Sequence, residues 1–360
     1  MVSSLNSGSV GNELTHFPNK KDCLKKGELS KLAKEGRTNL RVNKSKTLFN
    51  LVLLFFLLAN SAYSADHAVH TSAFFDRDGP ATTSADFLKI GIGAKAEGMG
   101  GAFVSLADDP SAIYWNPAGL SQLECSQVMF VHNLWSQDIR YEYLGYALPI
   151  DPKNTVAVAV MFLHMGEILG YDENDKPTSF FSAYDAAVLL GYSRKISSHL
   201  SLGWTAKGIL EKLEDQKAQA VAFDMGFFYD SYILSFGLSL RNLGTKLKFI
   251  EKKHPLPTDL KVGIAFKTLN NHLLLSTDID FLTDTSPVLQ QGIEYNFQNV
   301  LFIRSGVEYK TQNQSLGSST KPAIGGGIRI SKFQFDYTYS SVKPLGDLHN
   351  FSLIYMFGSE

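Results

Sequence analysis

Residues 234–240 read LSFGLSL, and large apolar side chains alternate strictly with serine and glycine along them. In an extended strand successive side chains point to opposite faces, so the leucines and the phenylalanine share one face and the small residues share the other. A helix would instead repeat its apolar positions every three or four residues. The stretch therefore predicts a β-strand with one apolar and one polar face.

The same alternation continues from Gln127 almost to the end of the chain. Many of the alternating segments are close to the roughly 9 to 11 residues that a tilted transmembrane strand requires, and their number is even, as in closed bacterial barrels. The sequence thus predicts an all-β fold, a 14-stranded antiparallel transmembrane β-barrel over residues 125–360. The predicted strands are 127–135, 139–149, 154–165, 183–195, 199–213, 219–229, 232–241, 259–268, 272–281, 288–297, 300–310, 321–330, 333–340 and 347–357.

The connections between these segments support the same architecture. Alternate connections are tight, for example at 197–198, 230–231 and 298–299, whereas several of the others are long, notably 166–182 and 242–258. Short turns at one rim and long loops at the other are typical of outer-membrane barrels. The short connection at Ser136–Asp138 departs from this rule.

The charged residues of the strands indicate which face is inside. A Lys or Arg that faces lipid at mid-membrane costs about 2–4 kcal/mol, so we expect the charged faces to line the lumen. Both signs occur on these faces, which favours a paired and hydrated lumen, and simple bracing of the inner wall is the leading interpretation of their role. The residues expected to face the lumen are Arg140, Glu142, Lys207, Asp224, Asp278, Asp280, Arg304, Glu308 and Asp336.

The N-terminal region resembles a leader. The whole chain has 34 basic and 35 acidic residues, but residues 1–47 hold ten Lys and Arg against four acidic residues. The apolar segment 48–59 follows, too short for a membrane-spanning helix but of the right length for a signal-peptide core. We predict that 1–64 is a leader cleaved near Ser64 or Ala65, which would export the remainder. An uncleaved membrane anchor is the alternative.

Residues 65–124 precede the first predicted strand and include the stretch GIGAKAEGMGGAFVSLADDPSAIYWNPAGL at 91–120. A dinucleotide-binding GxGxxG loop is disfavoured because Ala96 occupies the third glycine position and no long helix follows. Asp109 can begin a short helix with Pro110 at its first position, and that helix should end by Asn116, since Pro117 disfavours a helical residue before it. Because wide barrels are left open or plugged, we predict that 85–124 forms a hatch inside the barrel. A stretch pressed against the periplasmic rim is the alternative. The predicted gating residues are Trp115, Asn116, Pro117, Ala118 and Gly119.

The segments 93–110 and 114–120 resemble the N-terminal signature of the PorV/PorQ group of outer-membrane proteins, relatives of the FadL long-chain fatty-acid channels. The stretches 241–244, 255–257 and 346–351 are similar to the same group. The resemblance implies a FadL-like hatch whose turn is formed by Asn116, Pro117 and Ala118. It also implies an outer membrane of Gram-negative type. The chain departs from the group in continuing for three residues past Phe357.

No enzymatic site is predicted. The histidines show no HxxxH or HExxH spacing, Ser105 does not lie in a G-x-S-x-G elbow, and Asp278 with Asp280 is better explained as lumen wall than as an acid/base pair. We therefore expect no catalytic residues, no metal, no cofactor and no nucleic-acid partner. The expected partners are outer-membrane lipid and either a hydrophobic small molecule or exported proteins.

Three functions fit these observations. The first is passage of small hydrophobic molecules across the outer membrane, by local rearrangement near Asn116 to Ala118. The second is that of a PorV-like adaptor, which engages exported proteins of a type IX-like secretion system. The third is that of a soluble periplasmic β-protein.

Overall fold

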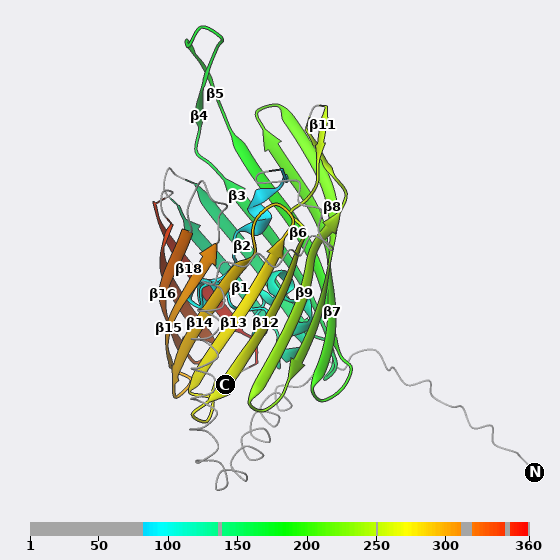
Figure 1. Ribbon diagram of the computed structural model, residues 1–360, viewed down its shortest axis with the longest axis vertical. Coiled ribbons are helices and arrows are strands. Elements are labelled where there is room, and N and C mark those ends of the chain that lie inside the picture. Colours follow the sequence, from blue (N-terminus) through cyan, green and yellow to red (C-terminus); the bar gives the residue numbers. More distant parts are fainter. Residues whose placement is uncertain (1–81, 136–138, 250, 311–318, 343–345, 359–360) are drawn as a thin grey trace, which may run out of the picture.

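The computed structural model describes residues 82–135, 139–249, 251–310, 319–342 and 346–358, and within these ranges fourteen antiparallel strands close into a barrel (Figure 1). The predicted all-β, 14-stranded barrel is therefore confirmed. Closure comes from the pairing of the first and last strands, in which Gln127 lies opposite Met356. The predicted leader, its apolar core at 48–59 and the cleavage site near Ser64 or Ala65 lie outside the described residues. The barrel strands are β1 (Gln127–Leu134), β2 (Arg140–Pro149), β3 (Asn154–His164), β6 (Ala183–Lys195), β7 (Leu200–Leu213), β8 (Gln216–Asp230), β9 (Leu234–Gly244), β12 (Asp259–Thr268), β13 (Leu273–Leu282), β14 (Val288–Phe297), β15 (Leu301–Lys310), β16 (Ser319–Ile330), β17 (Phe333–Val342) and β18 (Gly346–Met356).

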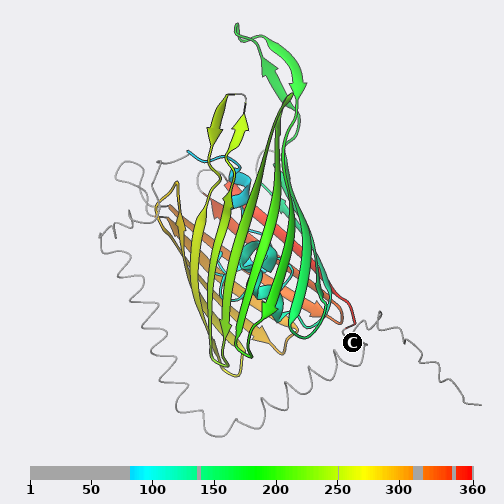
Figure 2. The same ribbon diagram turned by 90° about the vertical axis from the view of Figure 1, so that its right-hand side faces the viewer.

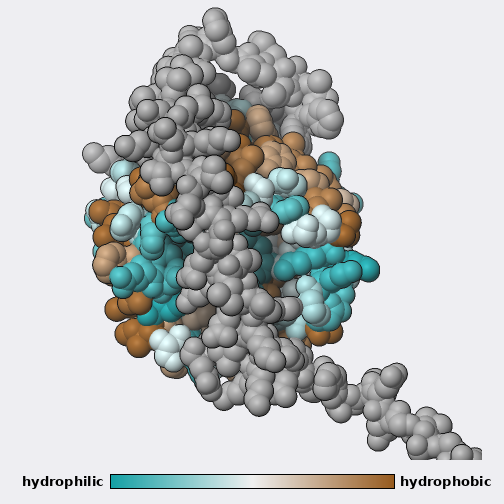
Figure 3. Space-filling view, turned by 90° about the horizontal axis from the view of Figure 1, so that it is seen from below, coloured by the Kyte–Doolittle hydropathy of each residue, from teal (hydrophilic) through white to brown (hydrophobic). Residues whose placement is uncertain are grey.

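The two ends of the barrel differ. One end has short turns such as Gln298–Asn299, where both residues have positive φ (54° and 57°), as a tight two-residue hairpin turn requires. At the other end two hairpins, β4 (Ile168–Tyr171) with β5 (Pro177–Phe181) and β10 (Leu247–Phe249) with β11 (Lys252–His254), form separate two-stranded sheets. Both hairpins project beyond the barrel, and the view in Figure 2 shows them standing apart from each other. Seen from the short-turn end, hydrophilic residues are interspersed with hydrophobic ones (Figure 3).

The outer face of the barrel is apolar. On β15, the side chains of Leu301 and Ile303 are 44% and 56% exposed, whereas that of Arg304, the residue directly after Ile303, is only 1% exposed. The same division recurs on β17, where Phe333 and Phe335 are exposed and Asp336 is buried. The alternation in the sequence therefore separates an outer apolar wall from an inner polar one.

The prediction that Arg140 and Glu142 face the lumen is wrong. On β2 the inward positions are taken by Tyr141 and Tyr143, which are buried, while Arg140 is exposed. The Glu142 carboxylate lies 3.2–3.4 Å from imidazole nitrogens of His132 and His164 on the neighbouring strands. Both residues lie toward the end of the barrel that carries the projecting hairpins, and the cost of a charge on the outer face falls sharply away from the middle of a membrane.

The hatch lies inside the barrel and is built from four short helices (Figure 2). They are η2 (Asp86–Lys89), α3 (Ala94–Gly98), α4 (Ala112–Trp115) and η3 (Pro117–Gln122). The regular helix α4 begins at Ala112, two residues after Pro110. The Asp109 carboxylate accepts hydrogen bonds from the amide and the hydroxyl of Ser111, and the bond from the amide is the one that a capping Asp makes. The helix ends at Trp115 because Asn116, before the proline, is extended (φ −159°, ψ 102°). Within the described ranges no helix is both long and apolar enough to cross a membrane.

Candidate functional site

The hatch backbone lies against glycines of the barrel wall. A Cβ atom at Gly226 would lie 2.8 Å from the backbone nitrogen of Ala118, and one at Gly203 would lie 2.4 Å from the carbonyl carbon of Pro117. A Cβ at Gly306 would lie 2.1 Å from the Gly100 nitrogen. Real side chains cannot approach this closely, so the wall lacks side chains where the hatch backbone passes. The hatch is therefore packed tightly against the wall at two separate places.

Asn116 links the hatch to itself and to the wall. Its Nδ2 donates to the carbonyl oxygens of Val104 (2.9 Å) and of Phe227 (3.0 Å) on β8, and its Oδ1 accepts from the amide of Ala118 (3.1 Å). All three polar contacts are buried or partly buried, where a lost hydrogen bond leaves an unpaired group and costs about 1–3 kcal/mol. We refer to these three bonds as the Asn116 latch.

The other predicted gating residues surround this latch. Trp115 donates from Nε1 to the Ile92 carbonyl (2.8 Å), and Pro117 begins η3. The Ala118 carbonyl accepts from the hydroxyls of Ser121 and Ser193, both at 2.9 Å. A Cβ at Gly119 would lie 2.3 Å from the Ala107 carbonyl oxygen, so that position requires glycine. The five residues thus form one connected, buried part of the hatch.

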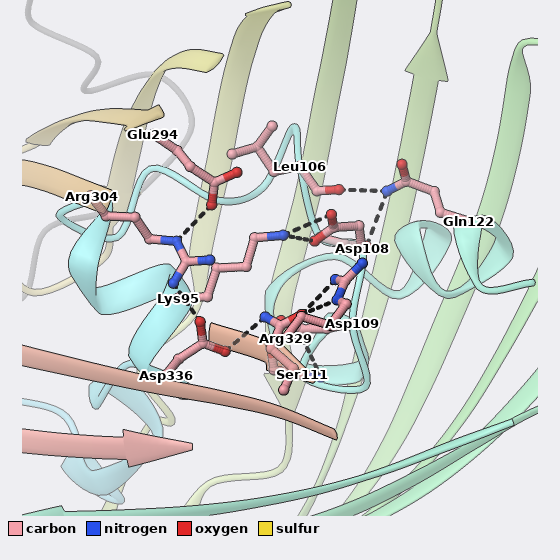
Figure 4. Close-up of polar contacts among 12 residues, drawn as sticks. Lys95, Leu106, Asp108, Asp109, Ser111, Gln122, Glu294, Arg304, Arg329 and Asp336 are labelled. Atoms are coloured by element: carbon pink, nitrogen blue, oxygen red, sulfur yellow. Dashed lines mark hydrogen bonds and ion pairs between the residues drawn. The ribbon is translucent and has the colours of Figure 1, made fainter. Parts of the chain in front are cut away.

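Arg304, Glu294 and Asp336 form a group that we call the lower charge cluster. It lies between the hatch and strands β14, β15 and β17 (Figure 4). Arg304 donates from Nε to Glu294 (2.6 Å) and from Nη1 to Asp336 (2.5 Å), and Asp336 also accepts from Gln334 (2.8 Å). Figure 4 shows Lys95 of α3 beside this cluster, with its ammonium bonded to Asp108 at 2.6 Å. Charged groups of the wall and of the hatch therefore meet in the lumen with opposite signs paired.

A second set of ion pairs follows the inner wall above the lower charge cluster. Lys207 pairs with Asp224 at 2.7 Å and Lys261 with Asp280 at 3.3 Å, and Arg241 is bonded to Asp259. These pairs join neighbouring strands from β7 to β13 and are almost fully buried. Removal of one partner of such a pair would leave an uncompensated buried charge, which typically destabilises the folded protein by about 3–5 kcal/mol.

Besides Arg140, Glu142 and Lys207, six residues were expected from the sequence to face the lumen, and they have different partners. Asp224, Asp280, Arg304 and Asp336 belong to ion pairs, and Asp278 accepts from the Val104 amide of the hatch at 2.8 Å. Glu308 is only partly buried and lies 3.1 Å from Lys310. Four partners in these ion pairs were not predicted from the sequence, although each occupies an inward position of an alternating segment: Arg241, Asp259, Lys261 and Glu294.

A cavity of about 450 Å³, which we call the vestibule, lies between the hatch and the end of the barrel that carries the hairpins. Tyr114 and Trp115 of the hatch line it, together with apolar side chains of the wall such as Ile139 and Leu348. The Arg241 guanidinium lies 4.8 Å from the Tyr114 ring centre, and the Lys261 ammonium lies 4.8 Å from that of Trp115. The vestibule thus combines aromatic surface with charges that are already paired.

The start of the hatch is held by charge. The Lys89 ammonium of η2 lies 2.5 Å from Asp284 and 2.9 Å from Asp86. Burial lowers the pKa of Lys89, but the two carboxylates raise it by more, so the net pKa lies above its usual value. Lys89 therefore stays charged and ties η2 to the loop after β13.

Deeper in the hatch, burial raises the pKa of Asp109 to about 6, and the neighbouring charge of Asp108 adds to this effect.

Among the described residues no three His, Cys, Asp or Glu side chains are grouped so that they could hold a metal ion.

The comparisons with known proteins concern mainly the fold. Residues 60–199 match the uncharacterised protein family UPF0164, and no curated protein matches the chain. The CymD monoaromatic hydrocarbon channel is similar in structure, with a TM-score of 0.57 and 12% identity over 74% of this chain and 98% of that one. The barrel has the FadL-type fold. A Pseudomonas aeruginosa FadL homologue (TM-score 0.54, 10% identity, 73% of this chain and 98% of that one) is also similar. So is the Pseudomonas putida toluene transporter TodX, with a TM-score of 0.54 and 15% identity over 73% of this chain and 96% of that one.

Proposed function

We propose that this FadL-type barrel sits in a bacterial outer membrane and passes small hydrophobic molecules. The observation that carries the proposal is the combination of an apolar outer wall with a lumen that is plugged by a hatch below a partly aromatic vestibule. An exposed apolar wall around the whole barrel can be covered by lipid. On a soluble periplasmic β-protein the same wall would face water, which is unfavourable for so large an apolar surface. The structural relatives described as a hydrocarbon channel and a toluene transporter support a ligand of this kind.

In this proposal the ligand enters the vestibule and passes when the Asn116 latch opens. The latch joins the hatch to β8 through a single side chain, so its release would loosen the chain at Asn116 without breaking the barrel. The Ala118 carbonyl would still be held by the Ser193 hydroxyl of β6. The leader predicted from the sequence would direct export of the remainder of the chain, which is the first step toward an outer membrane.

Deletion of residues 91–120 tests the gating role. The variant barrel should still assemble, since its strands pair only with one another, but it should increase the conductance of planar bilayers or the accumulation of radiolabelled toluene by cells. Permeability equal to that of the full chain, in a barrel shown to be assembled, would refute the gating role.

A finer test changes the latch alone. Asn116→Ala removes the bonds to Val104, Phe227 and Ala118 and should raise toluene accumulation, whereas Asn174→Ala, in the exposed β4–β5 turn, should leave it unchanged. Equal accumulation by both variants would contradict the latch.

A second candidate function is that of a PorV-like adaptor for exported proteins. The β4–β5 hairpin favours it, since Tyr171 and Phe180 are 63% and 61% exposed on a hairpin that projects from the barrel. Pull-down from outer membranes separates the two functions, because an adaptor should retain a secretion component or cargo protein and a channel should not.

A further inference from the structure

Three buried polar side chains without hydrogen-bond partners meet at the seam where the barrel closes. Asn133 of β1 lies directly opposite Asn350 of β18 and directly opposite Tyr141 of β2. Each of the three side chains is fully buried. Among the described residues, the side-chain amides of Asn133 and Asn350 and the Tyr141 hydroxyl have no hydrogen-bond partner. We call these three residues the seam cluster.

The seam cluster lies directly below the vestibule wall. Alternate residues of a strand point to the same face, and Trp135 and Leu348, each two residues from an asparagine of the cluster, line the vestibule. Ile139, two residues before Tyr141, lines it as well. All three strands therefore place an unpartnered polar group one inward position below a residue that touches the cavity.

The hatch bonds to the wall beside the cluster and leaves the cluster itself unpaired. The Ala94 amide donates to the Ser352 hydroxyl (2.7 Å), and the Ala94 carbonyl accepts from Thr338 (2.6 Å). Ser352 lies two residues beyond Asn350 on the same face, and Thr338 is opposite Asn350. Native proteins rarely leave several buried polar atoms unpaired together, so this cluster requires a partner or a role.

The chemistry of the cluster defines what it would bind. Two carboxamides and a phenol offer both donors and acceptors, and none of the three carries a charge. A charged ligand group would lose its hydration here without gaining a free opposite charge, because the nearby Glu97 is already paired with Lys321 at 2.6 Å. A pure hydrocarbon would leave the polar atoms of the cluster unpaired.

We propose that the seam cluster is a subsite for the uncharged polar end of the ligand, a hydroxyl or carbonyl group, whose apolar body contacts the aromatic surface of the vestibule. The inference rests on the proposed function and deepens it. The ligands would then be small apolar molecules with one neutral hydrogen-bonding group, and the cluster would select them over plain hydrocarbons.

Phenol and toluene are the probes for this subsite, because they have nearly the same shape and differ in a hydroxyl against a methyl group. Equilibrium dialysis with radiolabelled compounds gives the binding of each to the full-length protein in detergent. We expect phenol to bind roughly tenfold more tightly than toluene, since one hydrogen bond to otherwise unpaired buried groups is enough for a factor of this size.

Two variants remove the polar groups while keeping the shape. Asn133→Leu combined with Asn350→Leu, and separately Tyr141→Phe, should bring the ratio of the phenol and toluene affinities toward one and leave toluene binding unchanged. Loss of unpaired buried amides should leave the thermal midpoint of the double variant equal or higher. Tyr141→Phe deletes a single oxygen atom and keeps the test decisive if the double variant does not fold.

Ser239→Ala is the matched control. Its hydroxyl is also fully buried and unpartnered among the described residues, but it lies on β9, away from the seam, so the affinity ratio should keep its wild-type value. Toluene binding with an unchanged phenol preference in the folded seam variants would overturn the subsite and leave the proposed function standing. Failure of the wild-type protein to bind either compound saturably would overturn both.

Discussion

At the scale of single residues, the contact between hatch and wall depends on where a side chain is missing. A Cβ at Gly306 would lie 2.1 Å from the backbone nitrogen of Gly100, whereas a Cβ at Gly326, on the outer face of β16, would meet only the Phe302 carbonyl oxygen at 3.5 Å. Gly306→Ala should therefore destabilise the protein by about 1–3 kcal/mol or displace the hatch, as overpacking does in cores. Gly326→Ala is the control and should change little. The thermal midpoint and the protease sensitivity of the hatch are to be measured for both variants. Equal values for the two variants would contradict the close contact between Gly306 and Gly100.

Asp109 should make the stability of the folded protein depend on pH. Its pKa in the folded protein is about 6, above the usual 3.8, because burial and the charge of Asp108 disfavour the carboxylate. A raised carboxyl pKa means that the folded state binds the proton more tightly, so this group makes the protein more stable as pH falls from about 6 to about 4. The full contribution is on the order of 3 kcal/mol. Asp109→Asn should remove this contribution, so that the difference in thermal midpoint between wild type and variant changes between pH 4 and 7. A difference that stays constant over this range would contradict the raised pKa.

At the scale of elements, the β4–β5 hairpin is separable from the barrel. Its two strands pair only with each other, and its exposed aromatic residues contribute nothing to the lumen. Replacement of 168–181 by a short glycine and serine linker should therefore leave the thermal midpoint and the accumulation of toluene unchanged. If the hairpin docks an exported protein, the same change should abolish its recovery in pull-downs. A large loss of barrel stability would show that the hairpin supports the fold.

The strands themselves were predictable from the sequence because alternation reports directly on the two faces of a strand. The segments 183–195, 259–268 and 288–297 match β6, β12 and β14 at both ends. The projecting hairpins were not predicted as strands, since β5 and β11 are exposed on both faces and carry no alternation of hydrophobicity. Arg140 and Glu142 were misplaced because the cost of an outward charge was taken at mid-membrane, whereas these residues lie nearer the rim.

The candidate site was predictable only in part, because its contacts join distant parts of the chain. The sequence indicated a hatch and named the turn at Asn116, but the hydrogen-bond partner of that residue on β8 lies 111 positions away. The ion pair between Lys321 and Glu97 spans 224 positions. Wall glycines such as Gly226 carry no hydropathy signal, so only the closed barrel shows which of them face the hatch.

At the scale of the whole molecule, stability depends on closure of the ring. β18 pairs with both β1 and β17, so each of its neighbours would gain an unpaired edge if it were missing. A closed barrel in detergent should stay compact until it is boiled, and the full-length protein should therefore migrate faster on a gel when unheated than when heated. Removal of residues 346–360 should abolish this difference, because thirteen strands would remain with two open edges. Removal of residues 91–120 should preserve it, because the hatch contributes no strand to the ring. Loss of the difference in the second variant would mean that the hatch is needed for the barrel to assemble, and the barrel would then not be an independent frame within which a hatch can move.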